Sequence, residues 1–280
     1  MAGPLNTSPE YVAARRVLLD ALFLMRDQID ALVLVGAQAV YHHAPYGDPR
    51  PSYTTDADLA IDPDLLAQRP DLGSELAAAG FTLDEHGNPG HWFSPEGIVV
   101  DLMVPAGSLS ASTRRTAPLD GQARTTARRT RGLEAALHDN APAEITALEE
   151  SDPRRITVRI AGPAALVVAK AVKIHERLEI GNLDRVIAKD AGDLLRLLRN
   201  IAPECLGERL SELSEIEALG EQIDEVVDWL GSQFAGRRTT PLLQLALADL
   251  DGVEPAPQIE QAFRVLGTRL VSVFRSGRGR

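Results

Sequence analysis

The sequence predicts an α+β protein in which a mixed β-sheet with flanking helices is followed by a mainly helical C-terminal lobe. Before residue 155, short apolar or alternating runs typical of strands are separated by Gly and Pro turns. After it, apolar residues recur almost entirely at helical spacing. With 280 residues, 44% of them hydrophobic, the chain can form two cores. We therefore expect two domains, residues 1–155 and residues 156–280.

The first half is expected to begin with an amphipathic helix at residues 9–30, followed by a wholly apolar strand at 31–35 that ends at Gly36. The segments expected next are a helix at 37–43, a Pro-rich loop at 45–52, a strand at 54–61, a helix that Asp62 caps and that runs to Ala79, and strands at 81–84, 91–94 and 98–104. Because helices and strands do not alternate regularly, the pattern favours an α+β fold over a doubly wound one.

In the second half, residues 156–160 are expected to form one more strand. Gly162-Pro163 then opens a long helix at 164–178, since Pro is favoured in the first helical turn. Helical spacing continues at 189–199, 204–219, 222–234, 240–250 and 258–274.

Composition predicts a soluble, cytoplasmic protein with no membrane partner. No apolar run reaches the roughly 18 residues of a membrane span, and the single cysteine, Cys205, cannot form an internal disulfide. The net charge of −11 argues against general coating of nucleic acid.

One stretch reverses this charge. Residues 114–131, called the basic segment below, contain one acid, Asp120, and six arginines: Arg114, Arg115, Arg124, Arg128, Arg129 and Arg131. The basic segment is either a surface that binds a polyanion or a solvated loop.

Lysine is rare, with 3 lysines against 26 arginines, and all three lie within twenty residues, at Lys170, Lys173 and Lys189. A lysine is a compact point charge that can reach a phosphate from one side. The lysines are therefore candidate phosphate contacts, with an ordinary exposed role on a helix as the alternative.

Two carboxylates lie two residues apart in the expected strand at 54–61. The strand period puts Asp56 and Asp58 on one face, with Cα atoms roughly 7 Å apart. The other residues from position 57 to 61 are apolar, so we expect these acids at the exposed end of a core strand, where one divalent cation can bind both.

Asp101 is the only charged residue in the apolar run at 98–104, and such an acid needs a compensating charge. If its strand neighbours the strand at 54–61, Asp56, Asp58 and Asp101 form a three-carboxylate site for two metal ions. Ligands that are all oxygen favour Mg²⁺ or Mn²⁺. Gly36, between a strand and a helix, leaves backbone N–H groups suited to phosphate oxygens, although most glycines in such places are turn residues.

These motifs resemble the polymerase-beta-like nucleotidyltransferases, and among them the AbiEii or MenT toxins of two-component toxin–antitoxin systems. The resemblance covers about residues 30–200 and lies in Val33-Leu34-Val35-Gly36-Ala37-Gln38-Ala39-Val40, Thr55-Asp56-Ala57-Asp58-Leu59, Val100-Asp101, Lys170 to Arg177, and Lys189-Asp190-Ala191-Gly192-Asp193-Leu194. The chain departs from the family in having Gly36-Ala37 in place of Gly-Gly or Gly-Ser, and in its longer spacer before Asp56. It also lacks the arginine often found a few residues before the first Asp.

The resemblance implies a nucleotidyltransferase fold and transfer of a nucleotide from an NTP to an acceptor, often the 3′ end of tRNA. It makes Asp56 and Asp58 metal ligands, Lys170 or Lys173 a triphosphate contact, and Asp190 a further active-site acid. It also implies nucleotide contacts at Gly36, Ala37, Thr55, Arg177 and Lys189. An antitoxin partner, and control by phosphorylation of Thr54 or Thr55, are further implications of the resemblance.

Other functions stay open at this point. The acceptor can be a small molecule or a protein, and Asp-x-Asp also occurs in glycosyltransferases that use Mn²⁺ and a nucleotide sugar. A non-catalytic binding module with this fold is the remaining alternative.

Overall fold

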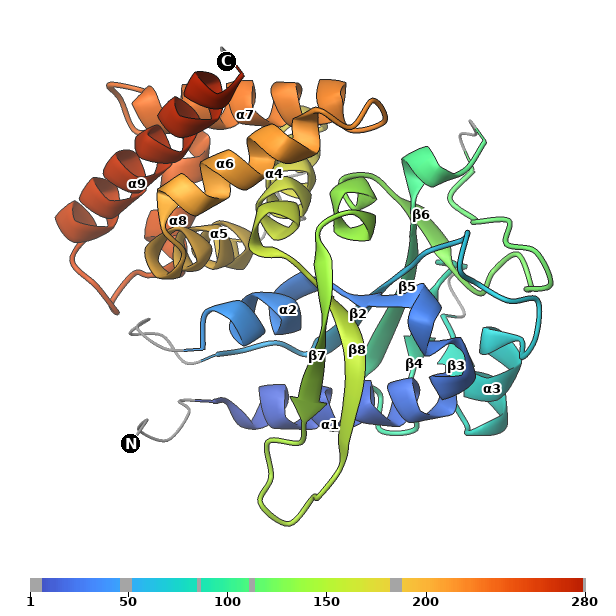
Figure 1. Cartoon of the computed structure of the whole chain (residues 1–280). Helices are drawn as coiled ribbons and strands as arrows, with labels where there is room; N and C mark the ends of the chain where they lie inside the picture. Colours follow the sequence, from blue (N-terminus) through green and yellow to red (C-terminus); the bar gives the residue numbers. More distant parts are fainter. Residues whose placement is uncertain (1–6, 46–51, 85–86, 111–113, 182–187, 279–280) are drawn as a thin grey trace. The chain divides into compact units, whose positions relative to one another are not determined.

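The computed structural model describes residues 7–45, 52–84, 87–110, 114–181 and 188–278 (Figure 1). The chain divides into two compact units, Met1–Tyr41 with Pro51–Ala161, and His42–Arg50 with Gly162–Arg280. The first unit contains a mixed β-sheet with flanking helices and the second is helical, so the α+β prediction is confirmed.

The described strands of the first unit form a single sheet in the order β3-β4-β5-β2-β1-β8-β7, with β6 paired to β5. Their bounds are β1 Leu32–Leu34, β2 Asp56–Ile61, β3 Thr82–Leu83, β4 His91–Phe93, β5 Val99–Pro105, β6 Arg128–Thr130, β7 Asn140–Thr146 and β8 Arg155–Ala161. The pairs β1–β8, β2–β5 and β5–β6 are parallel and the others are antiparallel. The central strands β1, β2 and β5 are almost wholly buried, which explains their apolar runs.

Three helices belong to the sheet region: α1 Pro9–Leu24, α2 Gly36–His43 and α3 Leu72–Ala78. Ser8 caps the start of α1, because its side chain accepts a hydrogen bond from the backbone N–H of Tyr11. α1 runs across one face of the sheet, against β2, β5 and β8 (Figure 1). Its buried side chains, among them Val17, Leu18 and Leu22, build the core on that face.

The second unit is built of α4 Pro163–Glu179, α5 Ala188–Asn200, α6 Pro203–Ser214, α7 Gly220–Ala235, α8 Pro241–Asp249 and α9 Ala256–Gly277. Each corresponds to a helix expected from the sequence. Phe234 of α7 and Phe263 of α9 are fully buried and meet edge to face, with ring centroids 4.8 Å apart. No helix in the described ranges is both long and apolar enough to cross a membrane.

Several local predictions were wrong. The N-terminal helix ends at Leu24, and a 3₁₀ helix, Arg26–Ala31, replaces its last turns. Asp62 caps no helix, because its carboxylate accepts a hydrogen bond from the backbone N–H of Asp64 and pairs with Arg159. The helix begins only after Asp71, which accepts a hydrogen bond from the backbone N–H of Ser74.

Two strands were not predicted at all. β6 lies inside the basic segment, where three polar residues give no apolar signal. β7 contains Pro142, which is tolerated because β7 is an edge strand paired only with β8 among the described residues. Most of the loop expected at 45–52 lies outside the described residues.

Candidate functional site

The three predicted acids lie on one face at the centre of the sheet. The register of the parallel strands β2 and β5 pairs Asp58 directly with Asp101. Residues directly opposite one another on neighbouring strands present their side chains to the same face, and Asp56 shares that face through the strand period. The condition set by the sequence, that the strand of Asp101 must neighbour the strand of Asp56 and Asp58, is therefore met.

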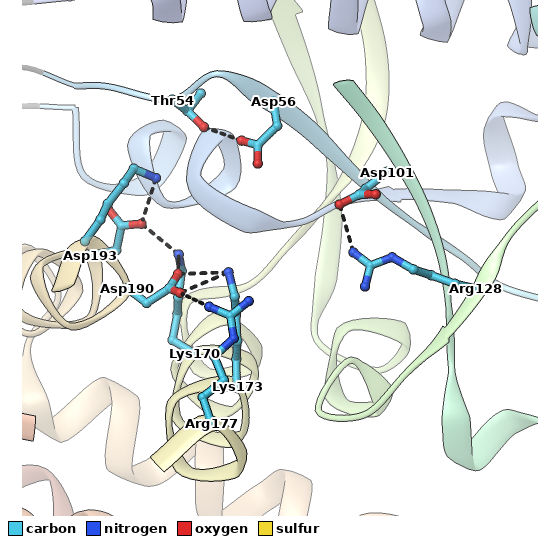
Figure 2. A network of polar contacts seen from close by, with 10 residues as sticks. Thr54, Asp56, Asp101, Arg128, Lys170, Lys173, Arg177, Asp190 and Asp193 are labelled. Atoms are coloured by element: carbon cyan, nitrogen blue, oxygen red, sulfur yellow. Dashed lines mark hydrogen bonds and ion pairs between the residues drawn. The ribbon is translucent and has the colours of Figure 1, made fainter. Parts of the chain in front are cut away.

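Asp101 is only 8% exposed, and each of its carboxylate oxygens has a basic partner. Its Oδ1 lies 2.8 Å from Nδ1 of His91, which the register of β4 and β5 places directly beside it. Its Oδ2 accepts a hydrogen bond of 2.8 Å from Nη2 of Arg128 (Figure 2). From the sequence, a metal ion was expected to supply the compensating charge that Asp101 needs. In the structure, Arg128 supplies that charge and His91 supports it.

These contacts shift the pKa values of Asp101 and His91. Burial alone would raise the pKa of Asp101, but the hydrogen bond to His91 and the charge of Arg128 outweigh burial and lower the pKa below its usual value. The same hydrogen bond raises the pKa of His91. Asp101 is therefore held in its ionised form.

Asp56 is held by buried neighbours through both its side chain and its backbone. The hydroxyl of Thr54 donates a hydrogen bond of 2.5 Å to Oδ1 of Asp56 (Figure 2). Nε2 of Gln38 donates to the backbone carbonyl of Asp56 at 3.0 Å, and Oε1 of Gln38 accepts from Nε of Arg15 at 2.8 Å. Thr54 is buried whereas Thr55 is exposed, so of the two threonines Thr55 is the accessible one.

Gly36 is the first residue of α2 and has a φ of +67°, in the left-handed region that favours glycine. A Cβ at this position would lie 1.9 Å from Oδ2 of Asp58. The backbone at the start of α2 therefore contacts the Asp58 carboxylate directly, and only glycine allows this approach. Ala37, the next residue, is buried.

The chemistry of these donors fits a hard divalent cation. Asp56 and Asp58 are half-buried carboxylates on one face of β2, and oxygen ligands of this kind suit Mg²⁺ or Mn²⁺. In the part of the chain that the structure describes, no group of three or more His, Cys, Asp or Glu side chains is arranged to hold a metal ion. Asp56 and Asp58 are thus the pair that could hold an ion, with Asp101 beside them and paired to Arg128.

Within the helical unit, the lysines form a cluster between α4 and α5. Nζ of Lys170 lies 2.7 Å from Oδ1 of Asp190 and 2.7 Å from Oδ2 of Asp193. Three further cations contact these two acids. Nζ of Lys173 lies 3.0 Å from Oδ2 of Asp190, and Nη1 of Arg177 lies 3.5 Å from the same oxygen. Nζ of Lys189 lies 3.5 Å from Oδ2 of Asp193. These six side chains, four cations and two carboxylates, carry a net charge of +2 among themselves.

The two lysines of α4 differ in exposure. Lys170 is fully buried, and although burial opposes its charge, Asp190 and Asp193 raise its pKa well above the usual value. Burial likewise opposes ionisation of Asp190 and Asp193, but Lys170 outweighs it and lowers the pKa of both. The side chain of Lys173 is 43% exposed. Lys170 therefore stabilises the cluster from inside, and Lys173 is the lysine that can meet an external anion.

The basic segment is not a uniform loop. Arg128 and Arg129 lie in β6, where Arg128 pairs with Asp101 and Nε of Arg129 donates to the backbone carbonyl of Thr116. The exposed arginines of the segment are Arg114, Arg115, Arg124 and Arg131.

Four residues support these sites in roles that the sequence did not assign to them. His91 and Arg128 contact the carboxylate of Asp101. Asp193 accepts a hydrogen bond from the ammonium of Lys170, and Gln38 donates a hydrogen bond to the backbone of Asp56. His91 lies in a short strand without metal-ligand spacing, and Arg128 lies 27 residues from its partner, so neither gave a local signal. Asp193 was within reach, because it lies one helical turn after Asp190.

Comparison with protein-family models, with curated proteins and with solved structures finds no match to this chain.

Proposed function

We propose that this protein is a nucleotidyltransferase that uses Mg²⁺ or Mn²⁺ to transfer a nucleotide from an NTP to an acceptor hydroxyl. The observation that carries the proposal is the register pair of Asp58 and Asp101, with Asp56 on the same face and the Gly36 turn against Asp58. Neighbouring carboxylates beside a helix start combine metal ligands with backbone donors for phosphate.

In the proposed reaction Asp56 and Asp58 would hold the ion, which when bound would neutralise phosphate charge and help to orient the α-phosphate. Thr54 keeps Asp56 in place. The missing side chain at Gly36 leaves room for the Asp58 carboxylate beside the start of α2, whose first N–H groups are the candidate donors to phosphate oxygens. The acceptor oxygen attacks the α-phosphate in line, its bond to phosphorus forms as the bond to pyrophosphate breaks, and its proton leaves to solvent. Because its pKa is low, Asp101 is a weak base that accepts a hydrogen bond from the attacking hydroxyl.

The resemblance assigns phosphate contacts to the α4–α5 cluster. Its net positive charge and the exposure of Lys173 support that assignment, with Arg177 and Lys189 as further cations. Lys170 and Asp190 would then be supports for these contacts, because both are buried.

For the acceptor we propose RNA, and specifically the 3′ end of tRNA, in keeping with the toxins that the sequence resembles. The exposed arginines of the basic segment supply the charge that RNA phosphates need on an otherwise acidic protein. An antitoxin protein is the partner that this role implies.

The test is transfer of label from each α-labelled NTP to total tRNA in the presence of Mg²⁺. We expect labelled tRNA with the wild type and none with Asp56→Asn/Asp58→Asn. Asp64→Asn, an exposed acid outside the site, is the matched control and should keep full activity. Transfer that survives the double substitution refutes the site. Hydrolysis of a nucleotide sugar without tRNA labelling would favour a glycosyltransferase, and NTP binding without any transfer would favour a binding module.

A further inference from the structure

We propose that Arg128 and His91 form a counter-ion clamp that positions Asp101 and offsets its charge when no divalent ion is bound. The counter-ion clamp consists of these two side chains and their contacts with Asp101. The geometry of the clamp rests on described contacts, whereas its link to a divalent ion rests on the proposed function.

The clamp is built from two strands that share one edge of β5. The register pairs His91 of β4 with Asp101, and Arg128 of β6 with Met103, two residues further along. The other edge of β5 is occupied by β2. Both basic side chains therefore reach Asp101 from the side opposite Asp58.

Gly90 makes this junction possible. It directly precedes β4 and has a φ of +74°, and its carbonyl accepts a hydrogen bond of 2.7 Å from the backbone N–H of Leu102. A Cβ at Gly90 would lie 2.3 Å from the carbonyl oxygen of Leu102 and 2.7 Å from the backbone nitrogen of Arg128. The three strands are therefore in close contact at the point where the clamp forms, which fixes both basic residues.

The clamp has an electrostatic purpose. Asp58 and Asp101 are like charges on directly paired positions, an arrangement that destabilises a sheet. Arg128 places a guanidinium 2.8 Å from Oδ2 of Asp101 and offsets that repulsion. The acids can then hold their positions before any ion arrives. Without Arg128, the folded state should depend on a divalent ion for the same compensation.

The test compares thermal unfolding of Arg128→Met with that of Arg124→Met, which removes the same charge from an exposed position of the same segment. In EDTA we expect Arg128→Met to lower Tm by on the order of 5 °C and Arg124→Met by about 1 °C or less. Rising Mg²⁺ should restore at least half of the loss in Arg128→Met and should change Arg124→Met no more than the wild type. Arg128→Lys, which keeps the charge, should fall between the wild type and Arg128→Met, and provides a folded variant if Arg128→Met does not fold.

Two results would overturn the clamp. One is an equal loss of Tm in Arg128→Met and Arg124→Met. The other is a loss in Arg128→Met that Mg²⁺ does not reduce, because Arg128 would then be only a partner of a buried acid. Neither readout uses catalysis. A wild type that transfers no nucleotide, combined with a loss in Arg128→Met that Mg²⁺ restores, would refute the proposed function and support the clamp.

Discussion

Replacing Lys170 with Met should destabilise the helical unit strongly, whereas the same change at Lys173, one turn along α4, should be mild. Met keeps the aliphatic stem of Lys170 but leaves Asp190 and Asp193 without the cation that lies 2.7 Å from each. Removing one partner of a buried ion pair costs about 3–5 kcal/mol. We expect the lower end, because Lys173, Arg177 and Lys189 still contact the two acids. At Lys173 the expected cost is about 1 kcal/mol or less, as for exposed pairs.

Urea unfolding can measure this difference in the helical unit alone. The chain has two tryptophans, Trp92 in β4 and Trp229 in α7, so a Trp92→Phe background leaves a reporter within the helices. Trp229 stacks on His175 of α4, with ring centroids 4.9 Å apart, and should respond when α4 separates from α7. For an m value of about 2 kcal/mol/M, Lys170→Met should lower the urea midpoint by about 1.5 M and Lys173→Met by about 0.5 M or less. Equal shifts, or a shift below about 0.5 M for Lys170→Met, would refute the reasoning.

Gly36→Ala should abolish nucleotide transfer and should lower the unfolding midpoint more than Gly97→Ala. Both glycines have positive φ, but only at Gly36 would a Cβ meet Asp58. Equal unfolding midpoints, with activity retained in both variants, would contradict this prediction. A further prediction concerns pH. The folded pKa values of Asp190 and Asp193 are lowered, so their ionised forms stabilise the folded state. This contribution to the free energy of unfolding is complete above the unfolded pKa of about 3.9 and is lost as pH falls through the folded pKa values. Acid unfolding of the helical unit should therefore be less steep below about pH 4 in Asp193→Asn than in the wild type, and identical profiles would contradict it.

The helical unit was predictable because its signals are local. Gly162-Pro163 marks the start of α4, and the spacing of apolar residues gives each later helix to within a few residues, apart from the end of α6. Strand existence was predictable where burial is complete, as in β1 and β5. Strand order was not, because pairing joins residues that are distant in sequence. The neighbour relation of β2 and β5 entered only as a condition, and the structure shows that the condition is met.

The partner of Asp101 shows why the candidate site was only partly predictable. A lone acid in an apolar run correctly indicated that a positive charge must lie nearby. Which group supplies this charge, however, depends on which strands pair with β5. The pairing of β6 with β5 brings Arg128 to Asp101, although Arg128 lies in the basic segment, which had been a candidate surface for binding RNA. Nη2 of Arg128 is bonded to the buried carboxylate of Asp101, and the Arg128 side chain is only 23% exposed, so Arg128 is poorly placed to bind an RNA phosphate. Arg128 therefore has to be counted with the acids, and any RNA affinity of the basic segment has to come from its exposed arginines.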